Sequence, residues 1–204
     1  MTIQELNKEL GNIDIYLLDQ VLKGRYSAGS KILDAGCGEG RNLIYFLNNG
    51  YEVYGVDQNP DALRMLHFIL GSKYPYCSKS HFVEGAVDDL KFDSDHFDLV
   101  ISSAVLHFAK NHSHFDQMFT EMIRVLKVGG QLFMRMASNI GLPELEIDPV
   151  TGQANLPDGS VRYLLTQSKI EQMVKEFDLS FVEPIKTTNV NNMRCMTTLV
   201  VTKD

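Results

Sequence analysis

The sequence predicts an α/β fold in which a mostly parallel, doubly wound sheet is covered by helices on both faces. Three observations predict it. Short β-forming segments alternate with amphipathic segments through the first two-thirds of the chain, which is typical of parallel strands joined by helical crossovers. A glycine-rich turn follows the first of these strands, and an acid ends the second. With 204 residues, 44% of them hydrophobic, the chain suits a single domain over residues 1–204.

The first third of the chain begins with a helix over residues 3–23, where apolar side chains recur every three or four positions. Gly11 and Asn12 interrupt that stripe, and Asn12 can cap a second piece. Asn59 followed by proline marks a further helix start. Between and around these signals, the expected elements are strand 31–35, helix 41–49, strand 51–56 and helix 60–70.

The remaining elements follow from the same patterns. An apolar face predicts a helix over 113–126, which Gly129-Gly130 would end, and Thr166 or Ser168 can cap a helix that runs to residue 177. The last two β-rich segments suggest an antiparallel hairpin at one edge of the sheet. The expected strands are residues 81–84, 97–102, 131–136, 179–186 and 193–202.

Two segments lie outside the alternating pattern. Residues 1–29 form an N-terminal helical cap, and residues 137–165 form an insertion with three prolines and little periodicity. A connection of this length in a compact domain is usually functional or mobile. We therefore expect the insertion to act as a lid.

Composition narrows the possible partners and surroundings. The formal net charge is -7 with scattered Lys and Arg, so we expect no nucleic-acid partner. No apolar run approaches the ~20 residues of a membrane span, and the acidic N-terminus lacks a signal pattern, so we expect no membrane association and a cytoplasmic location. The chain has three cysteines and no CxxC pair, so we expect neither a disulfide framework nor a metal site. Nothing indicates the oligomeric state.

The glycine turn, Leu33 to Arg41 (LDAGCGEGR), carries most of the functional information. Its glycines let a ligand approach the backbone, and Asp57 at the end of the next strand can accept hydrogen bonds from two ribose hydroxyls. Arg41 stands where a dinucleotide-binding turn has its third glycine, and Asp34 would oppose a pyrophosphate. An adenosine-containing cofactor with an amino group and no phosphate, such as S-adenosylmethionine, fits better than NAD.

This turn resembles the first motif of class I S-adenosylmethionine-dependent methyltransferases. The resemblance extends over nearly all of residues 30–202 through VYGVDQNP, FDLVISSAVLHF and LKVGG. It implies a Rossmann-like sheet of seven strands in the order 3-2-1-4-5-7-6, with the seventh antiparallel. GCGEGRN is also similar to the first turn of tellurite-resistance methyltransferases, but the C-terminal third is not.

The resemblance also implies a cofactor site. Gly36, Cys37, Gly38 and Gly40 would line the methionine part, and Asp34 would face its amino group. Arg41 and Asn42 would reach the carboxylate, although an exposed helix face suits Arg41 equally. Asp57 would hold the ribose, Gln58 would cover the adenine, and Ser102 would offer a carbonyl to the amino group. Cys37 fits better as a small packing residue than as a nucleophile.

One part of the chain departs from the family pattern. The family often carries an acid after the glycine of the third strand, where this chain has Ala86. Asp88 can substitute for it, with the backbone N–H of Val87 reading the adenine ring. Asp89 fits better as a solvated turn acid.

Candidate catalytic and acceptor-binding residues are less well defined, because methyl transfer from a sulfonium needs mainly positioning and a dry pocket. His107 follows the fourth strand and is the candidate general base, with packing beside Leu106 and Phe108 as the alternative. Tyr16, Arg135 and Arg162 are candidate substrate residues, and either arginine suits an anionic group.

The sequence therefore predicts a methyltransferase that uses S-adenosylmethionine and acts on an unidentified small molecule. A non-catalytic S-adenosylmethionine-binding module is the alternative. An NAD-dependent oxidoreductase is a weaker one, because of Arg41 in the glycine turn.

Overall fold

The computed structural model describes residues 1–204. Its helices are α1 (Ile3–Leu10), α2 (Ile15–Leu22), α3 (Ile44–Asn48), α4 (Pro60–Lys73), α5 (His112–Val125) and α6 (Gln167–Glu176), with short 3-10 turns η1 (Lys79–His81) and η2 (Leu106–Phe108). Its strands are β1 (Lys31–Ala35), β2 (Glu52–Asp57), β3 (Phe82–Glu84), β4 (Phe97–Ser103), β5 (Leu126–Ser138), β6 (Gln153–Asn155), β7 (Val161–Tyr163), β8 (Leu179–Phe181), β9 (Lys186–Val190) and β10 (Arg194–Lys203).

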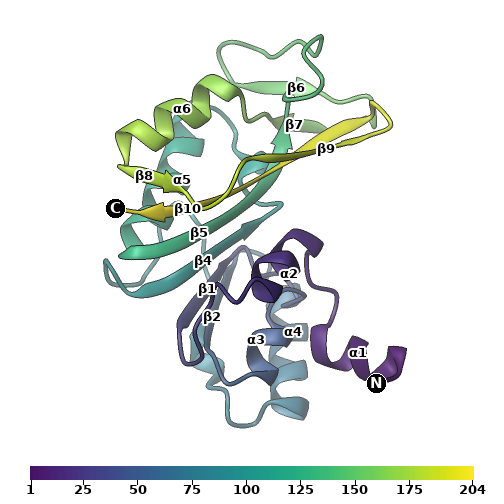
Figure 1. Cartoon of the computed structure of the whole chain (residues 1–204), viewed down its shortest axis with the longest axis vertical. Helices are drawn as coiled ribbons and strands as arrows, with labels where there is room; N and C mark the ends of the chain where they lie inside the picture. The colour runs from purple at the N-terminus through teal and green to yellow at the C-terminus, as the bar shows by residue number, and fades with distance from the viewer.

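The main sheet has the order β3-β2-β1-β4-β5-β10-β8, with β9 also paired to β10 (Figure 1). The first five positions run parallel, and β10 is antiparallel to β5. The expected order 3-2-1-4-5-7-6 is confirmed, with β10 as the seventh strand. The sixth position holds two short strands, because Pro184 lies between β8 and β9 and offers no N–H for the ladder.

Apolar side chains cover both faces of the sheet, because alternate residues of each buried strand point to opposite sides. On one side α2, α3 and α4 pack around Phe46 and Leu66, and on the other α5 and α6 pack around Phe119 and Ile170. Figure 1 shows the two groups of helices on opposite sides of the sheet. No helix is both long and apolar enough to span a bilayer.

Several boundaries differ from the predictions for local reasons. The N-terminal helix is broken at Gly11, whose φ is 63°, and Asp14 rather than Asn12 caps α2 through a bond from the Tyr16 amide. The helix after the glycine turn begins at Ile44 instead of Arg41. The α5 helix ends before Leu126 and strand β5 starts there, so the glycine pair at 129–130 lies inside the strand and does not end the helix.

The insertion over residues 137–165 contains more regular structure than the sequence predicts. β6 and β7 form a separate two-stranded antiparallel hairpin, which Figure 1 shows at the end of the molecule away from α1. His112 of α5 holds this hairpin, since its ring nitrogens contact the Tyr163 hydroxyl at 3.0 Å and the Pro149 carbonyl at 3.3 Å.

Candidate cofactor and acceptor site

A cavity of about 340 Å³ opens beyond the carboxyl ends of β1, β2 and β4, where ligands bind in open α/β sheets. Of the predicted cofactor residues, it brings together Gly36, Asp57, Gln58, Val87 and Asp88. The remaining lining residues come from the loops after β3 and β4 and from α5, and they are Gly85, Ala86, Ala104, Val105, Phe108, Lys110, His114 and Met118.

The glycine turn is held at the floor of this cavity by β2. The backbone amides of Gly36 and Cys37 donate to the Val56 carbonyl at 2.8 and 3.0 Å. Gly36 has a φ of 89°, and a Cβ there would lie 2.4 Å from a methyl group of Val105, so only glycine fits. Gly38, with a φ of 52°, has no atom within 4 Å of a Cβ position, which leaves open space for a ligand at this turn.

Asp57 is oriented by two backbone amides. One carboxylate oxygen accepts from Gly38 N at 2.7 Å, and the other accepts from Asn59 N at 2.8 Å. Each carboxylate oxygen keeps a free lone pair after these bonds. The half-buried carboxylate at the cavity wall can therefore accept from the hydroxyls of a ribose while the turn holds it in place.

Asp34 is a buried carboxyl group with one oxygen that lacks a hydrogen-bond partner. It is only 1% exposed, and its Oδ1 has no hydrogen bond. Burial raises the pKa of Asp34 to about 7. The positive charge of Arg41 and a hydrogen bond from the Asn42 side chain oppose this rise, and the negative charge of Asp57 adds to it. A cation beside the glycine turn would supply the missing partner, so the site fits the amino group of S-adenosylmethionine.

Two residues of the turn pack in the core. Cys37 is 4% exposed, and its sulfur would lie 2.8 Å from a Cβ at Gly55 on β2. Burial raises the pKa of the Cys37 thiol far above its ordinary value, which disfavours a nucleophilic thiolate. A Cβ at Gly40 would lie 2.6 Å from a methyl group of Leu66, so that glycine allows α4 to pack closely.

One end of the cavity, where the sequence analysis expects the adenine, is formed by the loop after β3. Val87 is buried, and Asp88 faces His114 at 3.4 Å. Asp89, whose side chain is 69% exposed, pairs with Lys91 instead. Ser102 lies within β4, fully buried, and its hydroxyl has no partner and does not line the cavity.

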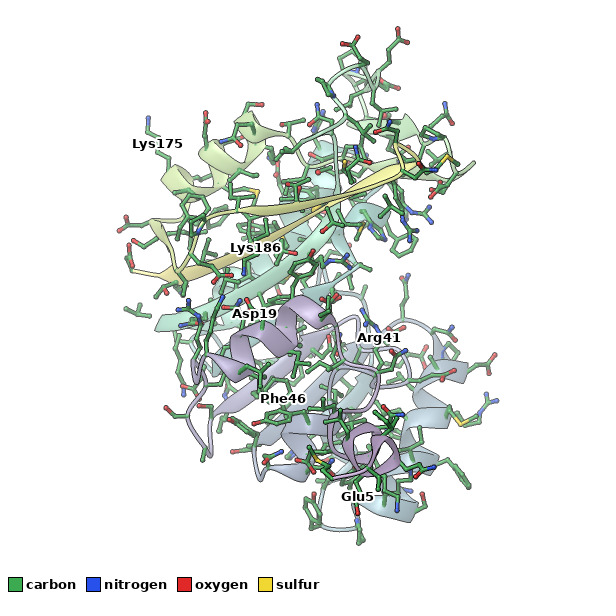
Figure 2. The ribbon with its side chains drawn as sticks, turned by 45° about the vertical axis from the view of Figure 1, so that its right-hand side comes forward. Glu5, Asp19, Arg41, Phe46, Lys175 and Lys186 are labelled. Carbon is green, nitrogen blue, oxygen red and sulfur yellow. The ribbon has the colours of Figure 1, made fainter.

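Arg41 and Asn42 contact the N-terminal cap. They line neither this cavity nor the second cavity described below. Both converge on Asp14, whose side chain is 2% exposed: the Asn42 Oδ1 accepts from the Asp14 amide at 3.0 Å, and Arg41 lies 3.7 Å from its carboxylate. Ser103 donates to the same carboxylate at 2.9 Å and accepts from Arg41 at 2.8 Å. Figure 2 shows the Arg41 side chain in the part of the molecule formed by the N-terminal half of the chain. Sequence reasoning missed Asp14.

A second cavity, of about 360 Å³, adjoins the first, and Ala104 lines both. Ala104 has a φ of 64° and donates its amide to the Arg135 carbonyl at 2.8 Å, so the chain turns sharply out of β4 between the cavities. The predicted residues His107, Arg135 and Arg162 line this second cavity. So do Arg194 and Asp158, which the sequence analysis did not identify, together with Ala137, Leu156, Ser160, Val190 and Met196.

Tyr16 reaches this region without lining either cavity. Its ring lies 5.2 Å from the guanidinium of Arg135, and its hydroxyl bonds to Thr188 of β9. Further along α2, Asp19 contacts Lys186 of β9 at 2.7 Å, and Figure 2 shows the two side chains near one another. The cap is thus joined to the outer strands of the sheet.

Comparison with known proteins places this geometry in context. The family model described as "Methyltransferase domain" matches residues 33–134, which include the glycine turn, Asp57 and β4. An uncharacterized methyltransferase of Synechocystis is 34% identical over 104 residues, 51% of this chain. The phthiotriol/phenolphthiotriol dimycocerosates methyltransferase of Mycobacterium leprae is 30% identical over 132 residues, 59% of this chain.

The alignments with these two relatives cover 45% and 43% of the relatives' own lengths, so the chain matches less than half of each. Among solved structures, a SAM-dependent methyltransferase from Methanosarcina mazei superposes with a TM-score of 0.69, covering 90% of this chain and 96% of that one. At 20% identity, that likeness shows the fold.

Proposed function

The chain belongs to the methyltransferase domain family, and from this premise we propose that it binds S-adenosylmethionine and transfers the methyl group to a small molecule. The observation that carries the proposal is the buried Asp34 carboxyl group, whose Oδ1 has no hydrogen-bond partner, next to a glycine turn with open space at Gly38. A buried carboxyl group of this kind favours a cationic ligand group and disfavours a pyrophosphate. The same observation argues against NAD.

Each part of the cofactor has a candidate partner in or beside the first cavity. Asp57 would accept from the ribose hydroxyls, and Gln58, Val87 and Asp88 would surround the adenine. Asp34 does not line the cavity but lies two residues before Gly36, which does, and it would pair with the amino group. When bound, S-adenosylmethionine supplies a methyl group on a positively charged sulfur. Phe108 and Val105 contribute apolar surface to the cavity, which would keep water from the reacting atoms.

The acceptor would occupy the second cavity. Ala104 is shared by the two cavities, so a molecule held in the second can approach one held in the first. Positioning of the two reactants side by side is the main contribution that a protein makes to a displacement of this kind. A cavity of about 360 Å³ has the size of a small-molecule site.

Calorimetry tests the cofactor assignment. We expect S-adenosylhomocysteine to bind and NAD not to bind. Asp57→Ala should weaken binding by about 1.5–3 kcal/mol, the size of hydrogen bonds to a charged group. Asp61→Ala is the matched control, because Asp61 is an exposed acid of α4 that pairs only with Arg64. Binding of NAD alone, or equal affinity in the Asp57 and Asp61 variants, would contradict the assignment.

Turnover separates an enzyme from a binding module. A catalytic protein releases S-adenosylhomocysteine from S-adenosylmethionine when it is mixed with fractions of a metabolite extract. Cofactor binding without release in any fraction would favour the non-catalytic alternative.

We also propose that residues 1–29 and 137–165 cover the acceptor. Leu156, Asp158, Ser160 and Arg162 of the insertion line the second cavity, and the cap reaches Arg135 through Asp14 and Tyr16. Amide hydrogen exchange should therefore slow in residues 1–24 and 137–162 when S-adenosylhomocysteine and a metabolite extract are added. Unchanged exchange in both segments, with protection of the glycine turn, would show that the cofactor binds without closure.

A further inference from the structure

We propose that the second cavity is an anion-binding site and that the methyl acceptor carries a carboxylate or phosphate group held by Arg135, Arg162, Arg194 and the Nε2–H of His107. That the bound anion is the methyl acceptor rests on the proposed function. That the cavity binds an anion is argued only from the side chains that line it.

The charge of the cavity is unbalanced. Three guanidinium groups line it, from β5, β7 and β10, whereas Asp158 is the only acid among the lining residues. Asp158 lies 3.9 Å from Arg194 and also accepts from the backbone and hydroxyl of Ser160. Outside the lining, the Asp14 carboxylate contacts Arg135 at 3.3 Å, but Arg41 shares that carboxylate at 3.7 Å. Positive charge therefore remains in excess, and an anion placed among the three arginines would relieve their repulsion.

Two of the arginines are held in place from behind. Arg135 is contacted by the Asp14 carboxylate at 3.3 Å and by the Tyr16 ring, and its buried Nε has no hydrogen-bond partner. The guanidinium of Arg162 stacks over the Phe108 ring at 4.9 Å. A guanidinium that is already oriented loses little entropy when it binds a carboxylate or phosphate.

His107 is a hydrogen-bond donor in this cavity. It is 8% exposed, and burial lowers the pKa of the imidazole to about 4, reinforced by the charges of Arg162, Arg194 and Arg135. The ring is therefore neutral near pH 7 and carries one N–H. Its Nδ1 accepts the Ala137 amide at 3.4 Å, which places the proton on Nε2, where the structure shows no protein partner.

This arrangement changes the role expected for His107. A general base needs a free lone pair and a pKa near the working pH, and this ring has its lone pair at the Ala137 amide and a pKa of about 4. As an N–H donor, His107 would position the anionic group of the acceptor. The aromatic ring of Phe108 lines the first cavity while Arg162 covers it, so a bound anion lies next to the cofactor site.

Binding of simple probes tests the site. Benzoate and inorganic phosphate are the probes, benzamide is the neutral match of benzoate, and calorimetry reports affinity. We expect at least one anion to bind wild type and benzamide not to bind. Arg162→Gln and Arg194→Gln should each weaken anion binding about tenfold, the size of one charge-assisted hydrogen bond. Arg64→Gln is the matched control, because the Arg64 side chain lies on the exposed face of α4.

Comparison of the two anions shows whether the acceptor carries a carboxylate or a phosphate group. Preference for benzoate identifies a carboxylate acceptor, and preference for phosphate identifies a phosphorylated one. The proposal is overturned if neither anion binds, if benzamide binds as tightly as benzoate, or if the Arg162 and Arg194 variants match Arg64→Gln.

A second measurement concerns His107. In ¹⁵N NMR titrations we expect its pKa to rise when the anion binds, because a negative charge favours the protonated ring. His107→Gln keeps an N–H donor and should retain more anion affinity than His107→Leu. Equal affinity in these two variants, or a pKa of His107 that does not respond to the anion, would refute the donor role.

Affinity for S-adenosylhomocysteine is measured in the same variants. Lost anion binding with retained cofactor binding supports the proposal. Failure of the wild type to bind S-adenosylhomocysteine would overturn the proposed function and would leave the anion results to be judged separately.

Discussion

Binding of S-adenosylhomocysteine is expected to weaken about tenfold for each pH unit below 7. The cause is Asp34, whose pKa burial raises to about 7 in the free protein. Below pH 7 the free carboxyl group is protonated, and it must lose that proton before it can pair with the amino group of the ligand. Above pH 7 it is already ionised, so affinity reaches a plateau there.

Calorimetry at pH 6 in two buffers of different ionisation enthalpy measures the released proton directly. Wild type should release nearly one proton on binding, and Asp34→Asn should release none and bind more weakly at pH 8. A wild-type protein that binds equally at pH 6 and pH 8 without proton release would show that Asp34 does not meet the amino group.

The Asp34→Asn variant also tests how burial of the Asp34 carboxyl group changes the free energy of unfolding. Because the folded-state pKa lies above the unfolded value near 3.8, folding favours the protonated group, and its contribution to stability falls as pH rises from about 4 to 7. Asp34→Asn should therefore be more stable than wild type at pH 8, with the difference shrinking as pH falls below 7. Denaturant titrations at both pH values measure this difference.

Gly38→Val is expected to abolish cofactor binding, by at least about a hundredfold or ~2.7 kcal/mol. No protein atom lies within 4 Å of a Cβ at this position, so the valine branches would project into the space left open for the ligand. The φ of 52° adds about 1–2 kcal/mol of backbone strain for a residue other than glycine.

Gly24→Val separates these two effects. Gly24 is exposed, has a φ of 67°, and also has no atom within 4 Å of a Cβ, but it lies in the loop after α2. Both variants should lose similar stability in denaturant titrations, and only the Gly38 variant should lose affinity for S-adenosylhomocysteine. Wild-type affinity in folded Gly38→Val would remove the glycine turn from the site.

The order of the elements and the glycine turn follow from local signals. Period-two and period-3.6 apolar patterns identified the parallel strands and their helices, and the acid at residue 57 after the second strand marked the cofactor edge. Residues 36, 57, 58, 87 and 88 do converge on one cavity. Residues 36 and 57 could be predicted because parallel strands bring their carboxyl ends to a shared edge, whereas residues 58, 87 and 88 were assigned through the resemblance to class I methyltransferases.

Other contacts had no signal in the sequence. The resemblance placed Arg41 and Asn42 at the ligand carboxylate, with an exposed helix face as the alternative for Arg41, and in the structure both meet Asp14, 27 and 28 positions earlier in the chain, in the N-terminal cap. The β6–β7 hairpin was missed because its strands have three residues each and gain their stability from α5 through His112 and Tyr163.

The sequence by itself determined the class of fold and the cofactor edge, because these depend on periodicity and on local turn chemistry. The strand order came from the resemblance to class I methyltransferases and not from any local pattern. The sequence named His107, Arg135 and Arg162 as candidates for the acceptor side, and only the tertiary structure showed that they share one cavity with Arg194. His107, Arg135, Arg162 and Arg194 come from four separate elements, and no spacing in the chain relates them. Their convergence, and with it the lowered pKa of His107, arises from long-range packing of β5, β7 and β10 around η2.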